Sequence, residues 1–431
     1  MPSRCRPSRF GITRTRLDRV EAVDSQGQVP GLPASTNPLT SLSEGSRVGL
    51  AMFTALEFFA GSGLVGLGLA PDFETLWAND NCAKKQAVYE ANHPQEKFHL
   101  GDIRHVHGHD LPVADLAWAS FPCQDLSLAG NLGGIESGTR SGLFWEWVRV
   151  LKELEDHGKR PPVLVAENVV GFVVADQGKH FQLAYNALRD MGYRVGAVVL
   201  DAKAFVPQSR PRAFIIAVSE DIPIDDLIQK FPSLPFHSSG LVRTSVTVND
   251  PDWLWWTLPF PIRETPIFAD LCERDALCDP RSKTRELCAM LSPLNQKKLE
   301  AAKRAKTFFA GTAYRRTRPD ENGVKTQRLE IRFDGIAGCL RTPNGGSSRQ
   351  TVILVDQGQV RSRLMTVREC ARLMGAPDTY KIPGSYNDGY RAMGDAVAVP
   401  ATRWLTRHLL AELAGRARSA RTRESVSRSA A

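Results

Sequence analysis

The sequence lacks three features that mark membrane, exported or zinc-binding proteins. No apolar run approaches the ~18 residues that a membrane-spanning helix needs. The arginines near the N-terminus are not followed by an apolar stretch, so a secretory signal is not expected. The eight cysteines form no Cys-x-x-Cys pair, which argues against zinc or any other metal site. We therefore expect a cytoplasmic protein with reduced thiols and no membrane partner.

Positive charge is in excess, and it is unevenly distributed. The net charge is +8 at pH 7. Basic residues predominate in residues 1–50, 297–332 and 415–431, and the rest of the chain is net negative. Such segments are either solvated surfaces and tails or surfaces that contact nucleic-acid phosphates. Charge alone favours solvated surfaces and tails over a phosphate-binding surface.

From residue 51 the sequence alternates between short apolar strands and helical stretches. Strands are expected at 54–59, 74–78, 97–100, 113–119, 162–166, 194–200 and 213–218, with helices at 64–70, 82–92, 142–156 and 180–191. This alternation predicts an α/β fold, a doubly wound and mostly parallel seven-stranded sheet of the Rossmann-like kind.

The remaining segments complete the expected domain organisation. Residues 1–50 are rich in Ser, Pro, Gly and Arg and predict a disordered basic extension, so a chain starting at Met52 should keep the whole core. The sheet domain is expected at 51–220 and a small irregular domain at 221–360. Residues 361–414 return to helix and complete the sheet domain, and 415–431 are expected to be a disordered basic tail.

Polar features follow the first three predicted strands, at the edge where open α/β sheets bind ligands. Phe59-Ala60-Gly61-Ser62-Gly63 joins a strand to a helix, and glycine there allows a nucleotide-like ligand to approach the backbone. Asp80 ends the second strand, where a carboxylate would reach ribose hydroxyls, and Asp102 ends the third. Either acid alone could be a helix cap. The series predicts an adenosine-containing cofactor without separating NAD from S-adenosylmethionine.

The later strand ends carry residues suited to covalent catalysis. Cys123 follows the fourth strand in FPCQDLS and precedes a glycine-rich stretch, and a helix start there would lower its pKa. Glu167 ends the fifth strand in AENV. Arg210 and Arg212 alternate in QSRPR and would point to one side if extended. Each of these residues also has a purely structural interpretation, the cysteine as a buried core thiol, the glutamate as a surface acid and the arginines as solvated side chains. Together they indicate a nucleophile, an acid and anion-binding groups at one edge.

The ordered motifs resemble those of the DNA (cytosine-5) methyltransferases of bacterial restriction-modification systems. FAGSG is similar to that family's cofactor loop, FPCQDLS to its nucleophile motif and TRSGLFWEWVRV to the segment that closes the following loop. AENV and QSRPR resemble its Glu and paired-Arg motifs, and RLMTVRECARLMGAPDTY and YRAMGDAVAVP its two C-terminal motifs. One departure is Asp395, where the family usually has asparagine. Aspartate accepts hydrogen bonds but lacks the amide donor.

The resemblance implies transfer of a methyl group from S-adenosyl-L-methionine to C5 of a cytosine flipped out of a specific double-stranded DNA site. Cys123 would add to C6, Glu167 would hold or protonate N3, and Arg212 with Arg210 would hold O2, while loop 124–141 closes over the base. The implied cofactor-binding residues are Phe59, Gly61, Gly63, Asp80, Asp102, Leu143 and Asp395. The motif residues implied to contact DNA are Gln124, Ser127 and Gln208.

The catalytic motifs recognise only one cytosine, so residues 221–360 are expected to read the rest of the site. Candidates are Lys303 and Arg304 for phosphates and Arg328 and Arg349 for base edges. The resemblance further implies a monomer at the bacterial nucleoid, with a cognate restriction endonuclease as a partner. Alternatives are an RNA cytosine-5 methyltransferase, a catalytically silent DNA-binding regulator and an NAD-dependent oxidoreductase. The last leaves Cys123 and the C-terminal motifs unexplained.

Overall fold

The computed structural model describes residues 52–93, 97–122, 142–261, 266–319, 323–342 and 349–430. Cys123, Gln124 and Ser127, together with the expected extension at 1–50, lie outside these residues. Within the described ranges, no helix is both long and apolar enough to cross a membrane.

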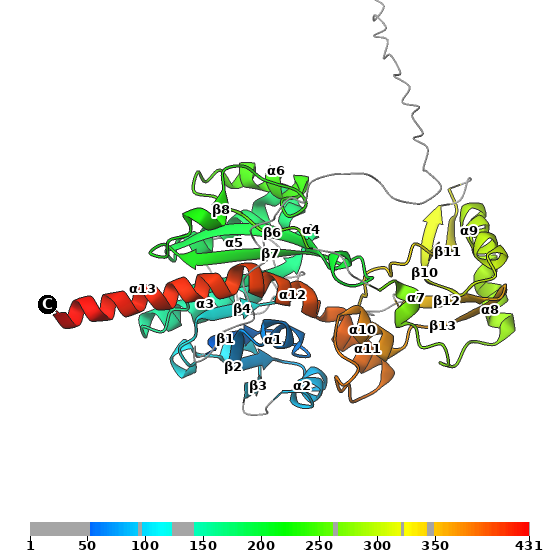
Figure 1. Ribbon diagram of the computed structural model, residues 1–431, viewed down its shortest axis with the longest axis horizontal. Helices are drawn as coiled ribbons and strands as arrows, with labels where there is room; N and C mark the ends of the chain where they lie inside the picture. Colours follow the sequence, from blue (N-terminus) through cyan, green and yellow to red (C-terminus); the bar gives the residue numbers. More distant parts are fainter. Residues whose placement is uncertain are drawn as a thin grey trace, which may run out of the picture. The chain divides into compact units, whose positions relative to one another are not determined.

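A seven-stranded sheet forms the larger domain, with its strands in the order β3-β2-β1-β4-β5-β7-β6 (Figure 1). Its pairings are parallel except those of β7, which runs antiparallel to both β5 and β6. This confirms the predicted doubly wound, mostly parallel fold. The strands are β1 (Phe53–Phe58), β2 (Phe73–Asp80), β3 (Phe98–Leu100), β4 (Leu116–Ala119), β5 (Val163–Val169), β6 (Tyr193–Asp201) and β7 (Pro211–Ser219).

Alternate strand residues supply two hydrophobic cores, one on each face of this sheet. Leu56 and Ala117 belong to one core, with α3 and α5, whereas Ala55 and Trp118 belong to the other, with the C-terminal helices. Burial on both faces explains why the strands are apolar runs rather than alternating ones. The first helices are α1 (Leu64–Leu69), α2 (Ala83–Glu90), α3 (Leu143–Asp156), α4 (Val170–Val174) and α5 (Lys179–Arg189). Short 3₁₀ turns lie at Ile103–His105, Gly108–Asp110, Ala175–Gly178, Ala202–Ala204 and Asp225–Leu227.

Residues 221–258 extend the larger domain, which moves the predicted domain boundary at 221. Trp256 lies in the core that contains Trp118, and the ring of Trp253 stacks on Tyr185 of α5 with centroids 5.1 Å apart. The WLWW stretch therefore packs on the sheet, and we place the start of the second domain after residue 261. The elements of this extension are β8 (Ile228–Gln229), α6 (Ser239–Val248) and β9 (Trp255–Trp256).

The second domain is built on a four-stranded antiparallel sheet of order β11-β10-β12-β13, which corrects the prediction that it is irregular. One face of β10 and β11 buries Ala313, Leu329 and Ile331, and the other carries arginines. The many charged residues in these two strands hid the alternation of apolar and polar positions, so the sequence was interpreted as irregular. The elements are α7 (Phe268–Leu271), α8 (Arg281–Ala289), α9 (Pro293–Arg304), β10 (Phe309–Pro319), β11 (Lys325–Arg332), β12 (Thr351–Asp356) and β13 (Gln359–Leu364).

The C-terminal segment packs on the larger domain, and its last residues up to 430 are helical where a disordered tail was predicted. The last helix continues to residue 430, and in its first half Arg416 pairs with Asp226 and Arg418 pairs with Asp115, with Nη2 2.7 Å from Oδ2. These arginines hold the helix against the sheet domain. The helices are α10 (Val367–Leu373), α11 (Tyr386–Asp395), α12 (Val399–Leu405), a π-helical turn at Thr406–Leu410 and α13 (Ala411–Ala430).

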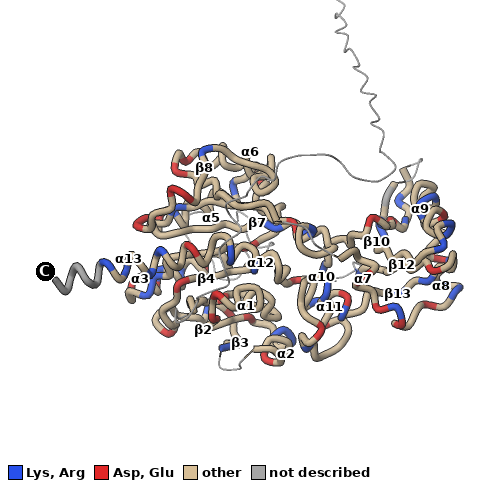
Figure 2. The backbone as a smooth tube through the Cα atoms, viewed as in Figure 1, with Lys and Arg blue, Asp and Glu red and all other residues tan. Residues whose placement is uncertain are grey.

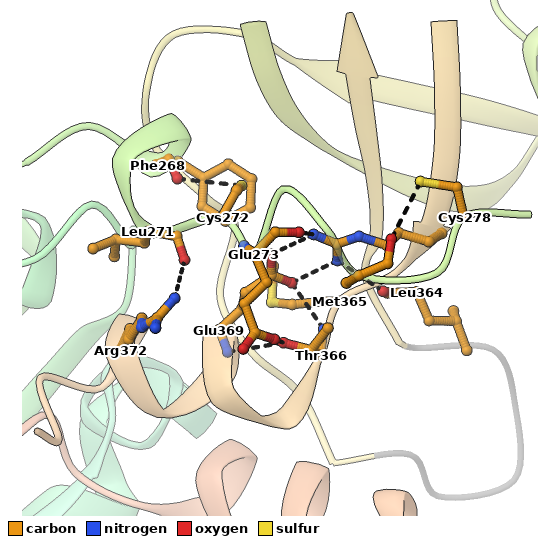
Figure 3. Close-up of polar contacts among 12 residues, drawn as sticks. Phe268, Leu271, Cys272, Glu273, Cys278, Leu364, Met365, Thr366, Glu369 and Arg372 are labelled. Atoms are coloured by element: carbon orange, nitrogen blue, oxygen red, sulfur yellow. Dashed lines mark hydrogen bonds and ion pairs between the residues drawn. The ribbon is translucent and has the colours of Figure 1, made fainter. Parts of the chain in front are cut away.

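A buried ion pair joins the small sheet to the returning segment. Arg363 of β13 donates from Nη1 and Nη2 to the carboxylate of Glu369 in α10, at 2.7 and 2.5 Å. Glu369 also accepts the N–H of Glu273, whose carboxylate accepts the Thr366 hydroxyl (Figure 3). The partnered carboxylate avoids the penalty of an isolated buried charge and fixes β13 to α10.

Candidate active site

A cavity of about 1220 Å³ opens at the carboxyl ends of the parallel strands. Because β7 is antiparallel, its beginning lies at the same edge as the ends of its neighbours. The predicted site residues that line the cavity are Phe59, Gly61, Asp80, Asp102, Leu143, Glu167, Arg210, Arg212 and Asp395. The structure thus brings together most of the predicted cofactor and catalytic residues that it describes.

Asp80 holds the turn between β1 and α1. Its Oδ2 accepts the N–H of Gly61 at 3.0 Å, and its Oδ1 accepts the N–H of Cys82 at 2.9 Å. Gly61 has φ +59°, a conformation that favours glycine. A Cβ added at this position would have its nearest non-neighbouring atom, Cδ of Lys85, at 3.9 Å, so the space beside Gly61 is open. Gly63 differs, because an added Cβ would lie 2.6 Å from Nε2 of His93. Gly61 leaves room for a ligand, whereas Gly63 serves the packing behind the turn.

Asp102, just after β3, and Leu143, at the start of α3, also line the cavity. Oδ1 of Asp102 accepts the N–H of Arg104 at 3.0 Å, so this acid caps a turn and also faces the cavity. Sequence reasoning missed Asn79, which donates its side-chain amide to the carbonyls of His99 and Gly101 at 3.0 and 2.9 Å. Asn79 therefore fixes the end of β3, and its position directly before Asp80 was the available signal.

Asp395 ends α11 and pairs with Lys85 of α2, with Oδ2 3.0 Å from Nζ. Its Oδ1 accepts a hydrogen bond from the Thr342 hydroxyl. Burial lowers the pKa of Lys85, but the carboxylates of Asp395 and Asp80 outweigh burial, so the pKa is raised and the ammonium is charged. Sequence reasoning missed Lys85 because nothing in the sequence separates it from Lys84, which pairs with Asp388.

Glu167 and Arg212 form a second polar group at the ends of β5 and β7. Nε of Arg212 lies 3.2 Å from Oε1 of Glu167, and Glu167 is buried. Burial raises the pKa of Glu167, although the charges of Arg212 and Arg210 and a hydrogen bond with Ser120 oppose the rise. A carboxyl whose pKa is raised holds its proton to higher pH and can act as an acid.

Arg210 and Gln208 join segments of the chain to one another. The Arg210 guanidinium is buried and donates to the carbonyls of Leu340, Gly394 and Ala396 at 2.9, 2.8 and 2.7 Å. Gln208 is fully buried, and its amide donates to Leu373 O at 2.7 Å and accepts from Leu340 N at 3.0 Å. These bonds hold buried segments of the chain together, and the predicted contacts of Gln208 with DNA and of Arg210 with the base stay predictions.

The chain leading to Cys123 enters the cavity. Phe121 and Pro122 line it, and the Phe121 carbonyl accepts a hydrogen bond from Nδ2 of Asn168 at 3.1 Å. The asparagine that follows Glu167 in AENV therefore fixes the backbone two residues before Cys123. Cys123 itself, with Gln124 and Ser127, lies outside the described residues.

One face of the small sheet also lines the cavity, through Tyr314 and Arg316 of β10 and Glu330 and Arg332 of β11. Arg328 pairs in register with Arg316 and so shares this face. None of the predicted DNA-reading residues of this domain is itself part of the cavity lining. Lys and Arg gather along α9, which ends at Lys303 and Arg304 (Figure 2). The Arg349 guanidinium lies 5.9 Å from the ring centroid of Tyr386.

The model of the C-5 cytosine-specific DNA methylase family matches residues 53–411. The chain therefore belongs to this family of S-adenosylmethionine-dependent enzymes. Type II methyltransferase M.Bsp6I of Bacillus sp. (strain RFL6) is 27% identical over 365 residues, which cover 83% of this chain and 98% of the relative. M.HhaI of Haemophilus parahaemolyticus is 27% identical over 353 residues, covering 81% and 92%. The predicted family, enzyme class and cofactor are confirmed.

Solved structures support the fold. Entamoeba histolytica methyltransferase EhMeth superposes with a TM-score of 0.55 at 12% identity, covering 84% of this chain and 99% of that one. Schizosaccharomyces pombe Dnmt2 gives a TM-score of 0.52 at 18% identity, covering 84% and 98%.

The cavity residues fit S-adenosylmethionine by their chemistry. The open space at Gly61 admits a ligand against the backbone of the turn, and carboxylates at Asp80 and Asp102 suit hydroxyl and amino donors of an adenosine. The cofactor supplies an electrophilic methyl group when bound. We assign Phe59, Gly61, Asp80, Asp102 and Leu143 to its adenosine end as a proposal.

Proposed function

We propose that the protein methylates C5 of a cytosine within a specific double-stranded DNA site through a covalent bond between Sγ of Cys123 and C6. C5 of cytosine is a weak nucleophile, and addition of a thiolate to C6 gives an enamine whose C5 can attack a methyl electrophile. The observation that carries the proposal is the buried Glu167–Arg212 pair, which lines the same cavity as the cofactor turn. Phe121 and Pro122 lead into that cavity.

Each described residue has a task in this reaction. Protonated Glu167 donates to N3 as electron density moves there, and the Arg212 guanidinium holds O2 of the base. Arg210 holds β7 and the segment around Asp395 together and acts on the base only through them. After the methyl group reaches C5, a base removes the C5 proton. The Sγ–C6 bond then breaks and returns the thiolate.

A cytosine inside a duplex does not expose C6 to a thiol. The base must be rotated into the cavity, which costs a few kcal/mol of stacking and pairing. We propose that residues 124–141, with glycines at 130, 133, 134 and 138, close over the flipped base and bring Cys123 to C6.

Recognition of the surrounding bases is assigned to the second domain, at about residues 266–364. Its cavity-facing strands offer arginines beside the base pocket, and we propose Arg328, together with Arg349, for base edges. Lys303 and Arg304 at the end of α9 are proposed for phosphates. Base edges carry sequence information, whereas phosphates mainly fix position.

The covalent step is tested with a DNA duplex that carries 5-fluorocytosine at the target. Fluorine blocks the final deprotonation, so wild type should form a stable adduct that survives denaturing electrophoresis. Cys123→Ala should form none while still binding DNA. The matched control is Cys339→Ala, since the Cys339 thiol lines the cavity and its loss should leave the adduct intact. An adduct with Cys123→Ala would overturn the assignment.

We further propose that the enzyme acts as a monomer on DNA at the nucleoid and protects its site from a cognate restriction endonuclease. Mapping 5-methylcytosine after expression in a methylation-free host identifies the site. DNA from that host should resist any endonuclease that cuts the site, and sedimentation should give a single species near 47.5 kDa.

A further inference from the structure

The Lys85–Asp395 ion pair joins two helices at the wall of the cavity. Its members come from α2 and α11, which lie far apart in the sequence, and both side chains line the cavity with exposed fractions of 19% and 34%. Cδ of Lys85 lies 3.9 Å from the position that a Cβ at Gly61 would occupy, and it is the nearest atom there apart from the chain neighbours of Gly61. The pair therefore lies over the turn that is assigned to the cofactor.

The sulfonium of S-adenosylmethionine carries three groups, and the cavity offers a direction for each. The adenosine is assigned to the ends of β2 and β3, at Asp80 and Asp102. The methyl group must face the base pocket at Glu167. The third group ends in an α-ammonium and an α-carboxylate. Once the adenosine and the methyl group are assigned, the remaining part of the cavity for this group is the wall formed by α2 and α11.

That wall has the charges that a zwitterion needs. Lys85 Nζ has three donors, and one of them serves Asp395. Asp395 uses one oxygen for Lys85 and the other for Thr342, and each carboxylate oxygen has a second lone pair. A paired cation and anion side by side complement a ligand that presents one charge of each sign.

We propose that Lys85 and Asp395 bind the amino-acid end of the cofactor, with the Lys85 ammonium on the α-carboxylate and the Asp395 carboxylate on the α-ammonium. The inference rests on the proposed function and on the assignment of the adenosine to the ends of β2 and β3. It also explains the residue at 395, because Lys85 supplies the donor that an asparagine amide would otherwise provide.

The test is calorimetric binding of two compounds that share the adenosine and differ at this end. S-adenosylhomocysteine keeps the amino acid, and 5′-methylthioadenosine lacks it. Lys85→Met should lower the affinity for S-adenosylhomocysteine about tenfold or more, the loss expected for a charge-assisted hydrogen bond. It should leave the affinity for 5′-methylthioadenosine within about twofold of the wild-type value. Lys84→Met is the matched control, since the neighbouring lysine pairs with Asp388 and lies outside the cavity lining. It should change neither affinity.

Two further variants sharpen the result. Lys85→Gln keeps a polar side chain, is the second choice if Lys85→Met does not fold, and should show the same selective loss. Arg391→Met removes another cation that lines the cavity on α11. If only Arg391→Met shows the selective loss, or if Lys85→Met weakens both compounds equally or neither, the inference is overturned. Failure of wild type to bind either compound would instead overturn the cofactor site itself, and this inference with it.

Discussion

Arg212 and Glu167 meet across the antiparallel pairing of β7 and β5, with Nε 3.2 Å from Oε1. The contact sets two effects against each other, because burial favours the protonated acid and the guanidinium favours the carboxylate. Burial prevails, and the pKa of Glu167 is raised. The same arginine that is proposed to hold the base therefore limits how strongly its neighbour keeps a proton.

Glu167→Gln is expected to lower turnover by about 10²–10⁴, the range for loss of a general acid. The raised pKa means that wild-type turnover falls as pH rises through that pKa, and this alkaline decline should vanish in the variant because an amide does not titrate. Affinity for S-adenosylhomocysteine should stay unchanged. Steady-state rates from pH 5 to 9 check the profile. A large loss of cofactor affinity would show that Glu167 serves the cofactor instead.

The two arginines of QSRPR should separate in their effects. Arg210→Lys removes bonds to three buried carbonyls and is expected to cost about 3–5 kcal/mol of unfolding free energy. Arg212→Lys should cost little stability but lower turnover, because its guanidinium is proposed to act on the base. Urea unfolding beside single-turnover rates distinguishes them. Equal stability of the two variants would contradict the structural role of Arg210.

Glu57 of β1 gives the stability of the protein a specific pH dependence. Burial raises its pKa from the ordinary 4.5 to about 8; the Gly66 backbone opposes the rise and the charge of Asp80 adds to it. Between these values the folded state keeps a proton that the unfolded chain releases, so stability falls as pH increases, by up to about 1.4 kcal/mol per pH unit. Glu57→Gln should be more stable than wild type at pH 8 and similar to it at pH 4.5. Denaturant unfolding at both pH values measures the difference, and Glu74→Gln, on the neighbouring strand, is the control.

Exchange of residues 266–364 for the equivalent region of a relative with another target should transfer the target sequence. The boundaries follow the observed cores and leave 221–258 with the sheet domain. Arg328→Ala should reduce the discrimination between bases at one position of the site by about 1–3 kcal/mol. Arg304→Ala should instead weaken binding to DNA of every sequence and should lower the slope of log affinity against log salt concentration by about one. Methylome maps and binding at several salt concentrations check these outcomes. An active hybrid that keeps its original site would show that this region is not the reader.

Local sequence patterns predicted the large sheet well because its strands are buried on both faces and the helices α3 and α5 are amphipathic. They failed where a local pattern does not decide the structure. The arginines of β10 and β11 obscured an alternating strand, and those of α13 looked solvated although Arg416 and Arg418 pair with Asp226 and Asp115. The roles of Lys85, Asn79 and Gln208 depend on partners far along the chain, which composition and spacing do not reveal.

The packing of α12 on α1 has a consequence for biosynthesis. Arg403 donates to the carbonyl of Leu67 at 2.9 Å, 336 positions earlier, and the core around Ala55 and Trp118 is completed by residues 405–417. A ribosome makes the first strands long before it makes their cover, while the strands of the small sheet all emerge together between residues 309 and 364. From this order of synthesis we expect the strands of the small sheet to pair before residues 405–417 complete the core of the large sheet. A prematurely terminated chain would carry the glycine turn and Glu167 without Asp395, and would leave host DNA unmodified.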